Sequence, residues 1–173
     1  MPYYKKKKYI ELAVNSVIQQ TYKNFELIIV HDDENKEDLN FLKNLIKKDK
    51  RIKLYINKKN LGAGESRNKG IKLSQGSLIA FLDADDLWTR NKLKKQIFFM
   101  KKNLVDISHT SYHIINSDNK IIGSRRAKDM NHKLLLSSCD IGLSTVIMKK
   151  KLITNKIKFA NINTKEDYVF WLK

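Results

Sequence analysis

The sequence predicts an α/β domain built on a mainly parallel sheet flanked by helices. Residues 25–30 and 78–82 form short apolar stretches rich in β-branched and aromatic residues, which is typical of buried strands. Segments whose apolar residues recur every three or four positions alternate with these stretches, and such alternation indicates helices covering a parallel sheet. The length of 173 residues fits one domain.

Each element follows from its own apolar pattern. We predict helices at residues 9–20, 37–48, 66–73 and 92–102, and strands at 25–30, 52–56 and 78–82. The pattern weakens after residue 106. There we predict strands at 107–115 and 120–124 around a turn at 117–119, a short helix at 131–138, a strand at 144–148 and a helix start at 164–167.

The net charge of +17 raises the question of a nucleic-acid partner. Only five of the 35 basic residues are arginines, although proteins that read nucleic-acid sequence depend on arginine for bidentate contacts to bases. We therefore predict no specific nucleic-acid partner. The lysines either reflect overall composition or attract an anionic membrane surface, for which the run 5–8 is the strongest local candidate.

The chain lacks an apolar stretch of about 20 residues and an N-terminal signal peptide core. Its single cysteine, Cys139, cannot form an internal disulfide, which fits a reducing compartment. We predict a cytoplasmic protein with peripheral contact at the inner face of the membrane.

Acidic clusters follow two of the predicted buried strands, at 32–34 and 83–86. In open α/β sheets, ligands bind beyond the carboxyl ends of the strands. Carboxylates crowded at such a point repel each other unless a cation compensates, and Mg²⁺ and Mn²⁺ prefer hard oxygen ligands. Asp83 and Asp85 are therefore candidate metal ligands. The alternative is a solvated acidic loop that precedes the next helix.

Five segments, in order, match motifs of one known family: Pro2–Lys5, Ser16–Tyr22, Asn60–Gly70, Gly76–Trp88 and Glu166–Trp171. The last two segments carry an Asp-x-Asp motif and a Glu-Asp motif. By these motifs the chain resembles the bacterial family 2 glycosyltransferases over most of its length. The resemblance implies a GT-A (Rossmann-like) fold with its first strand missing, because only Met1 precedes the Pro-x-Tyr segment, and we expect a chain truncated at both ends.

The resemblance also implies a single domain over 1–173, with a nucleotide-sugar-binding part at about 1–105 and an incomplete acceptor-side part at about 106–173. The implied reaction is inverting transfer of a sugar from a nucleotide-diphosphate donor to a saccharide or lipid-linked acceptor in cell-surface polysaccharide synthesis. Two other readings remain open: a glycosyltransferase fragment without activity, and a basic nucleic-acid-binding protein.

The family's functional residues map onto five positions. Asp83 and Asp85 would hold Mg²⁺ or Mn²⁺ against the donor diphosphate. Asp32 would accept a hydrogen bond from the base, usually uracil, which points to a UDP-sugar donor. Arg67 would contact the nucleotide or diphosphate. Asp167 would be the general base that removes the acceptor hydroxyl's proton.

For the Glu-Asp motif, the residue types alone support a second interpretation. Glu166 and Asp167 would then only favour a helix N-terminus through its dipole, with Thr164 as the cap.

Overall fold

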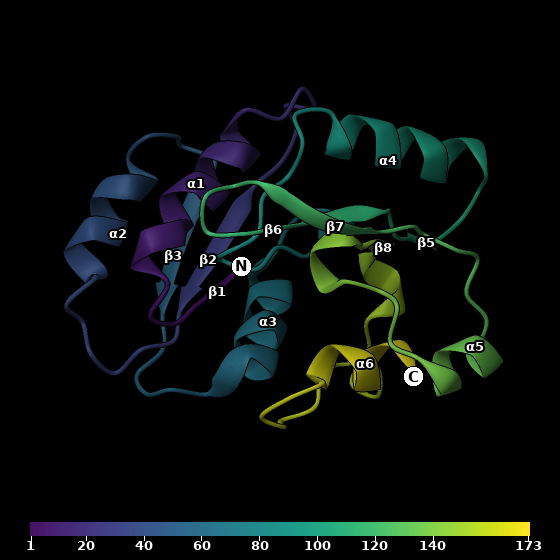
Figure 1. Cartoon of the computed structure of the whole chain (residues 1–173). Helices are drawn as coiled ribbons and strands as arrows, with labels where there is room; N and C mark the ends of the chain where they lie inside the picture. The colour runs from purple at the N-terminus through teal and green to yellow at the C-terminus, as the bar shows by residue number, and fades with distance from the viewer.

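A computed structural model describes all 173 residues as an α/β structure with two small sheets and a separate hairpin (Figure 1). The first sheet is parallel, in the order β1-β2-β3. Its strands are β1 (Pro2–Tyr3), β2 (Leu27–His31) and β3 (Ile52–Ile56). The connecting helices are α1 (Lys7–Ile18) and α2 (Leu39–Ile46), at the positions that the apolar spacing predicts.

Strand β2 is the centre of this half of the molecule. All five of its residues are buried, as expected for a strand with neighbours on both edges and helices on its faces. Helix α1 contributes Ile10, Val14 and Val17 to the same cluster, which are three- and four-residue steps along one helical face. Burial of this apolar surface is the main stabilising contribution in the N-terminal half.

The second sheet is antiparallel, in the order β4-β8-β5. Its strands are β4 (Leu78–Ala80), β8 (Ile147–Lys149) and β5 (Ile107–Ser108). The prediction of one mainly parallel sheet therefore holds only for the first half of the chain. An apolar stretch indicates a strand but not its partner, and the partner of β4 comes from about 70 residues later in the chain.

Two longer helices join the strands that surround the site. Helix α3 (Gly62–Leu73) leads from β3 to β4 and packs on β1 and β2, and it begins four residues earlier than predicted. Helix α4 (Lys92–Lys102) leads from β4 to β5 and has the predicted bounds. No helix of the chain is both long enough and apolar enough to span a membrane.

On the side of β2 opposite β3, the neighbouring strand covers only the carboxyl end of β2. Pro2–Tyr3 forms a two-residue strand opposite Val30–His31, so the position beside β2 that was expected to be empty is partly occupied. The terminal ammonium of Met1 donates a hydrogen bond to the Ile28 carbonyl at 3.0 Å, and burial lowers its pKa to about 5. Beyond Met1, a pocket of about 650 Å³ separates β2 from β4.

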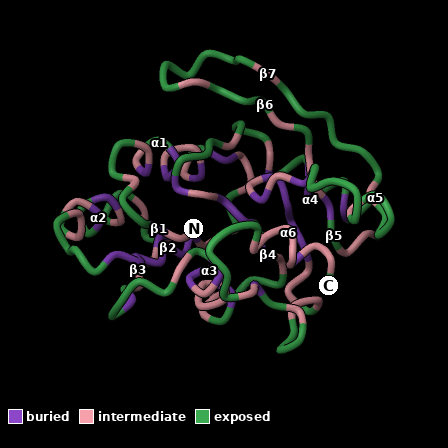
Figure 2. The backbone as a smooth tube through the Cα atoms, turned by 60° about the horizontal axis from the view of Figure 1, so that its bottom comes forward, coloured by how far each residue is buried: buried purple, intermediate pink, exposed green.

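The remaining chain forms a peripheral layer. The hairpin of β6 (Tyr112–Ile115) and β7 (Ile121–Arg125) has the predicted turn, with Asn119 in the left-handed region at φ 60°. Helix α5 (His132–Ser137) is capped by the side chain of Asn131. Neither element has a buried residue, and Figure 2 shows the hairpin as an exposed loop at the edge of the molecule.

The chain ends in two short 3₁₀ turns and a helix. The turns are Leu143–Thr145 and Lys150–Leu152, and the final helix is α6 (Glu166–Trp171). Phe170 of α6 stacks on Phe159 with ring centroids 4.3 Å apart, and Phe81 meets both rings edge-on. This aromatic cluster holds α6 against the end of β4, where the acidic turn begins.

Candidate donor and transfer site

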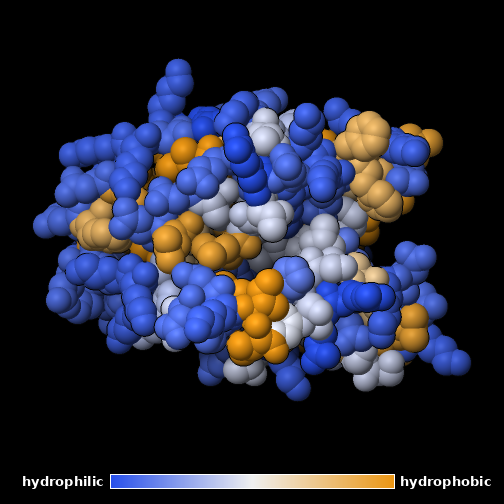
Figure 3. Space-filling model, turned by 45° about the horizontal axis from the view of Figure 1, so that its top comes forward, coloured by the Kyte–Doolittle hydropathy of each residue, from blue (hydrophilic) through white to orange (hydrophobic).

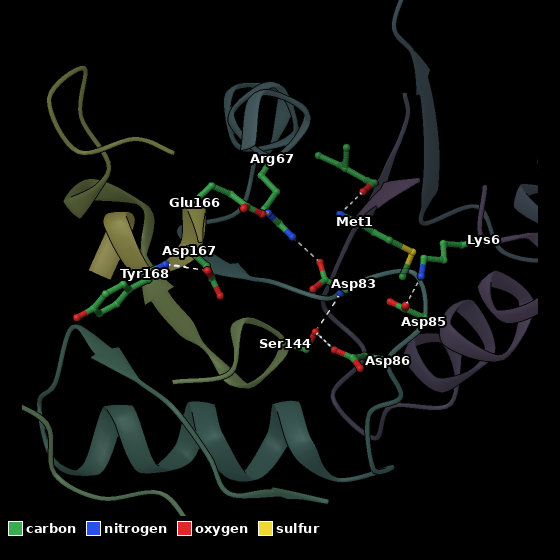
Figure 4. Close-up of polar contacts among 11 residues, drawn as sticks. Met1, Lys6, Arg67, Asp83, Asp85, Asp86, Ser144, Glu166, Asp167 and Tyr168 are labelled. Atoms are coloured by element: carbon green, nitrogen blue, oxygen red, sulfur yellow. Dashed lines mark hydrogen bonds and ion pairs between the residues drawn. The ribbon is translucent and has the colours of Figure 1, made fainter. Parts of the chain in front are cut away.

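The acidic turn at 83–86 follows β4, so the strand carries its carboxylates to the edge of the sheet. Each of the three carboxylates has a different partner. Asp83 accepts a hydrogen bond from Arg67, Asp85 pairs with Lys6, and Asp86 accepts one from Ser144 (Figure 4). The structure therefore brings the two predicted metal ligands together in one turn and gives each a cationic neighbour.

Arg67 joins three elements at this point. It lies on α3 with 8% of its surface exposed, and its two terminal nitrogens donate to Asp83 at 2.7 Å and to Glu166 at 2.5 Å. Burial by itself would lower the pKa of Arg67, but the two carboxylates outweigh burial and raise it. The Nε atom is buried without a partner. Arg67 is thus a fixed cation between the acidic turn and α6, as Figure 4 shows.

Lys6 approaches the turn from the segment that leads into α1. Its Nζ lies 2.7 Å from Asp85 Oδ2, and both side chains are partly exposed, at 44% and 39%. This ion pair raises the pKa of Lys6, with its hydrogen bond to Asp85 as the largest cause. In the absence of a ligand, a lysine ammonium therefore compensates the charge of Asp85.

Ser144 fastens the turn to the second sheet. Its hydroxyl accepts a hydrogen bond from the Asp83 backbone N–H at 3.0 Å and donates one to Asp86 at 2.5 Å. The carboxyl group of Asp86 is crowded by protein although the residue as a whole is exposed. This loss of water raises its pKa, and the neighbouring carboxylates of Asp83 and Asp85 add to the effect.

Asp32 lies at the end of β2 and is 2% exposed. Its Oδ1 accepts hydrogen bonds from Asn57 Nδ2 at 2.7 Å and from the Leu61 N–H at 2.8 Å. Asp33, the next residue, accepts one from the Asn35 N–H. Asp32 therefore anchors the segment before α3 through one oxygen. It follows β2 of the first sheet, whereas the acidic turn follows β4 of the second sheet.

Asp167 and its neighbour have different surroundings. Glu166 is the partner of Arg67, whereas Asp167 forms no ion pair and accepts one hydrogen bond, from the Tyr168 N–H at 2.8 Å. Figure 4 shows Asp167 on the α6 side of the Arg67–Asp83 bridge. The expectation of a Thr164 cap is wrong, because Lys165 precedes the helix in a left-handed conformation at φ 59° and no side chain caps it.

The residues present fit a divalent ion held jointly with a ligand. No group of three or more histidine, cysteine or acidic side chains converges to form a closed cage. Mg²⁺ commonly takes one or two protein carboxylates together with phosphate oxygens and water. Asp85 is partly exposed, and Asp83 has one oxygen that Arg67 does not contact, so the pair suits that mode.

The contacts of three residues of this site could not be predicted from the sequence motifs. Lys6 belongs to a run of four lysines that looks uniform, and Ser144 lies in the stretch where the pattern is weakest. Glu166 belongs to the Glu-Asp motif, but only the structure shows that it pairs with Arg67. Trp88 and Trp171 pack against the apolar clusters.

Residues 1–159 match the profile of glycosyl transferase family 2, which is more than nine-tenths of the chain. The chain belongs to glycosyl transferase family 2. The matched residues include Arg67 and the Asp83–Asp86 turn drawn in Figure 4, whereas Glu166 and Asp167 lie beyond them.

Curated relatives place the chain among bacterial members of the family. It is 40% identical over 173 residues to the Escherichia coli UDP-Glc:alpha-D-GlcNAc-diphosphoundecaprenol beta-1,3-glucosyltransferase WfgD, covering 99% of this chain and 66% of WfgD. It is 39% identical to an uncharacterized glycosyltransferase of Rickettsia conorii, covering 29% of that protein. It is 33% identical to the putative teichuronic acid biosynthesis glycosyltransferase TuaG of Bacillus subtilis, covering 99% of this chain and 68% of TuaG.

Solved structures confirm the GT-A fold. TarS of Staphylococcus aureus in complex with UDP-GlcNAc superposes with a TM-score of 0.79 at 22% identity, over 98% of this chain and 50% of TarS 1–349. The complex of TarS 1–349 with UDP gives a TM-score of 0.72 at 25% identity, over 98% and 52% of the two chains. The chain thus spans about half the length of these structures and between about a quarter and two thirds of the first curated relatives.

Proposed function

We propose that this chain binds a UDP-sugar together with Mg²⁺ or Mn²⁺ and supplies the donor and base residues of an inverting hexosyltransferase. The acceptor would be a lipid-linked saccharide, and the pathway would be cell-surface polysaccharide synthesis. The observation that carries the proposal is the Asp83–Asp86 turn, which α3 and α6 flank through the two ion pairs of Arg67. The activity in the name of WfgD and the UDP complex of TarS support the choice of donor and acceptor.

The acidic turn supplies the charge for donor binding. Asp85, with the free oxygen of Asp83, would hold the metal, and a divalent ion bound there would offset the negative charge of the diphosphate leaving group. Arg67 keeps Asp83 in place and adds positive charge at the same edge. Asp32 would contact the base. The two hydrogen bonds to its Oδ1 fix its position at the end of β2 and leave Oδ2 for that contact.

Asp167 would act as the general base. An inverting displacement needs a carboxylate on the side of the sugar opposite the leaving group, and that carboxylate must be free to accept the proton. Glu166 is held by Arg67, whereas Asp167 has no cation on it, so the two neighbouring acids suit different tasks. Glu166 positions the helix, and Asp167 receives the proton of the acceptor hydroxyl.

Thermal unfolding with UDP and Mn²⁺ tests the donor site. A ligand at 100 times its Kd stabilises the folded state by about 2.7 kcal/mol, which for a chain of this size raises Tm by roughly 5–10 °C. We expect this shift only when UDP and the metal are both present. Asp85→Ala should abolish it, whereas Asp118→Ala, on the exposed hairpin turn, should not. Equal binding of UDP by the Asp85 variant would refute the metal assignment.

Transfer assays on Asp167→Asn test the base. The substitution keeps the size of the side chain, so UDP binding should stay at the wild-type level while transfer from UDP-glucose falls by about 10²–10⁴-fold. Turnover near the wild-type rate would exclude Asp167 as the base. An intact donor site with no transfer by the wild-type chain would favour the fragment without activity. Salt-sensitive DNA or RNA binding that is indifferent to Asp85 would favour the nucleic-acid-binding alternative.

A further inference from the structure

Helix α4 has an unusual outer face. Its inner side buries Leu93, Ile97 and Met100 against Ile147 of β8, as an amphipathic helix should. Its outer side also carries large apolar groups, because Phe98 and Phe99 are 66% and 52% exposed. Two adjacent phenylalanines in water are unfavourable for an isolated domain, and exposed apolar patches commonly mark an interaction surface.

The exposed phenylalanines are framed by positive charge. Lys94 and Lys95 lie one turn before them, and Lys101 and Lys102 lie one turn after them. All four lysines are exposed, none forms a salt bridge, and α4 contains no acidic residue. Leu104, just beyond the helix, is 87% exposed and extends the apolar strip. Figure 3 shows apolar side chains breaking the hydrophilic surface at the upper right, over the end of the molecule where α4 lies.

Exposed phenylalanines framed by lysines favour a membrane surface as the partner of this face. Lysines around exposed aromatic and leucine side chains are typical of helices that lie in the interface of a membrane, with the apolar groups among the acyl chains and the ammonium groups at the headgroups. A protein partner matched to the patch would need acidic groups around an apolar centre. An anionic bilayer offers both over any area, and the net charge of +17 attracts it at long range.

We propose that the outer face of α4, which we call the α4 face (Lys94, Lys95, Phe98, Phe99, Lys101, Lys102 and Leu104), docks on an anionic lipid bilayer. The phenylalanines insert at the headgroup boundary, and the four lysines contact the lipid phosphates. The inference does not depend on the proposed transfer reaction, because it rests only on the exposure and charge of this face.

The lysine run at 5–8 is a weaker candidate for the same role. Lys6 is paired with Asp85, and Lys7 lies 3.1 Å from Asp38, so two of its four charges face carboxylates. Its two exposed neighbours, Lys5 and Lys8, flank no exposed phenylalanine. Long-range attraction includes these lysines, but the α4 face has the two most exposed aromatic side chains of the chain, Phe98 and Phe99, and four lysines without carboxylate partners.

Co-sedimentation with vesicles tests the proposal. The full chain should pellet with vesicles containing 30% phosphatidylglycerol in phosphatidylcholine and stay in solution with phosphatidylcholine alone. Phe98→Ser/Phe99→Ser should lower the partition coefficient by about tenfold or more. Lys94→Glu/Lys95→Glu should lower it by a similar factor, since one lysine near an anionic surface contributes roughly fivefold.

Leu12→Ser is the matched control. Leu12 is 48% exposed on α1, so the substitution removes a similar exposed apolar group outside the α4 face and should leave the partition coefficient unchanged. Circular dichroism of each variant checks that the fold is retained. The vesicle assay contains no nucleotide sugar. A negative result would therefore contradict the membrane proposal without bearing on the UDP-binding proposal.

Three results would overturn the proposal. One is the absence of pelleting with anionic vesicles, and another is equal partition of the phenylalanine variant and the wild type. The third comes from sedimentation velocity without lipid. A concentration-dependent dimer that Phe98→Ser/Phe99→Ser dissociates would show that a second copy of the chain covers the α4 face.

Discussion

Strand β2 and the β6–β7 hairpin are built from similar residues and end up in opposite surroundings. Both contain runs of isoleucine, yet every residue of β2 is buried and no residue of the hairpin is. In β2 the neighbours are strands and helices packed on both faces, whereas the hairpin strands have only each other. The comparison shows that the N-terminal half of the chain has a core of its own. The hairpin depends on the hydrogen bonds between its two strands.

Truncation of one isoleucine in each region should give the largest contrast. Ile29 in β2 is fully buried, and Ile29→Ala should cost about 3 kcal/mol through lost burial and the cavity left behind. Ile122 in β7 is 66% exposed, and Ile122→Ala should cost less than about 0.5 kcal/mol. Urea unfolding of both variants measures the difference. Equal losses would mean that the hairpin belongs to the same cooperative core.

The pocket between β2 and β4 lies in the N-terminal half. Filling it should raise the free energy of unfolding by somewhat less than the loss expected for Ile29→Ala. Four residues of sequence Ile-Ser-Ile-Val joined before Met1 would continue the β1 row along Leu27–Ile28. Each buried aliphatic side chain contributes roughly 1.5–3 kcal/mol before the entropy of ordering is subtracted, so we expect a net gain of about 2 kcal/mol. Thermal unfolding against a Gly-Ser-Gly-Ser extension measures it.

The outcome that contradicts this idea is equal Tm for the two extensions.

A smaller effect should come from His31, the last residue of β2. Both ring nitrogens are buried without partners, and the ring stacks on Tyr3. Burial lowers its pKa, although Asp33, Asp38 and Asp32 partly oppose the shift. The folded state therefore binds fewer protons than the unfolded state, and stability is lost as pH falls below about 6.5, the pKa of an unperturbed histidine.

His31→Leu should flatten this pH dependence and add about 1 kcal/mol at pH 7, because two unpaired polar atoms leave the core. Burial lowers the pKa of the Met1 terminal ammonium to about 5. The variant should therefore still lose some stability as pH falls from 8 to 5. Urea unfolding from pH 5 to 8 checks both. His132→Leu, on exposed α5, is the control and should leave the pH profile as it is.

The smallest effect is expected at the surface of the N-terminal half, where two adjacent lysines form exposed ion pairs. Lys6→Met and Lys7→Met should each change stability by less than about 1 kcal/mol. Only Lys6→Met frees Asp85, and it should strengthen Mn²⁺ binding by about fivefold in isothermal titration. The same gain in both variants would indicate a general charge effect rather than release of Asp85.

The helices and strands of the N-terminal half could be predicted because the spacing of apolar residues that indicates each one lies within the segment itself. The period of α4 runs without interruption, and its predicted bounds match the structure. The partner of β4 could not be predicted, because antiparallel pairing with β8 is a long-range choice that no local pattern records. In the site, motifs indicated Asp83, Asp85 and Arg67. The contacts of Ser144 and Lys6 join residues 58 to 79 positions apart and depend on tertiary packing.

Arg67 links the acidic turn to the position of α6. Its guanidinium holds the acidic turn with one nitrogen and α6 with another, so the two sides share one cation. A ligand that draws Asp83 toward itself weakens one of these bonds and leaves more of the positive charge to Glu166. Ligand binding at Asp83 and the placement of α6 would therefore be coupled, and the coupling would be reciprocal: a contact that fixes α6 in place would change the affinity for that ligand by the same factor.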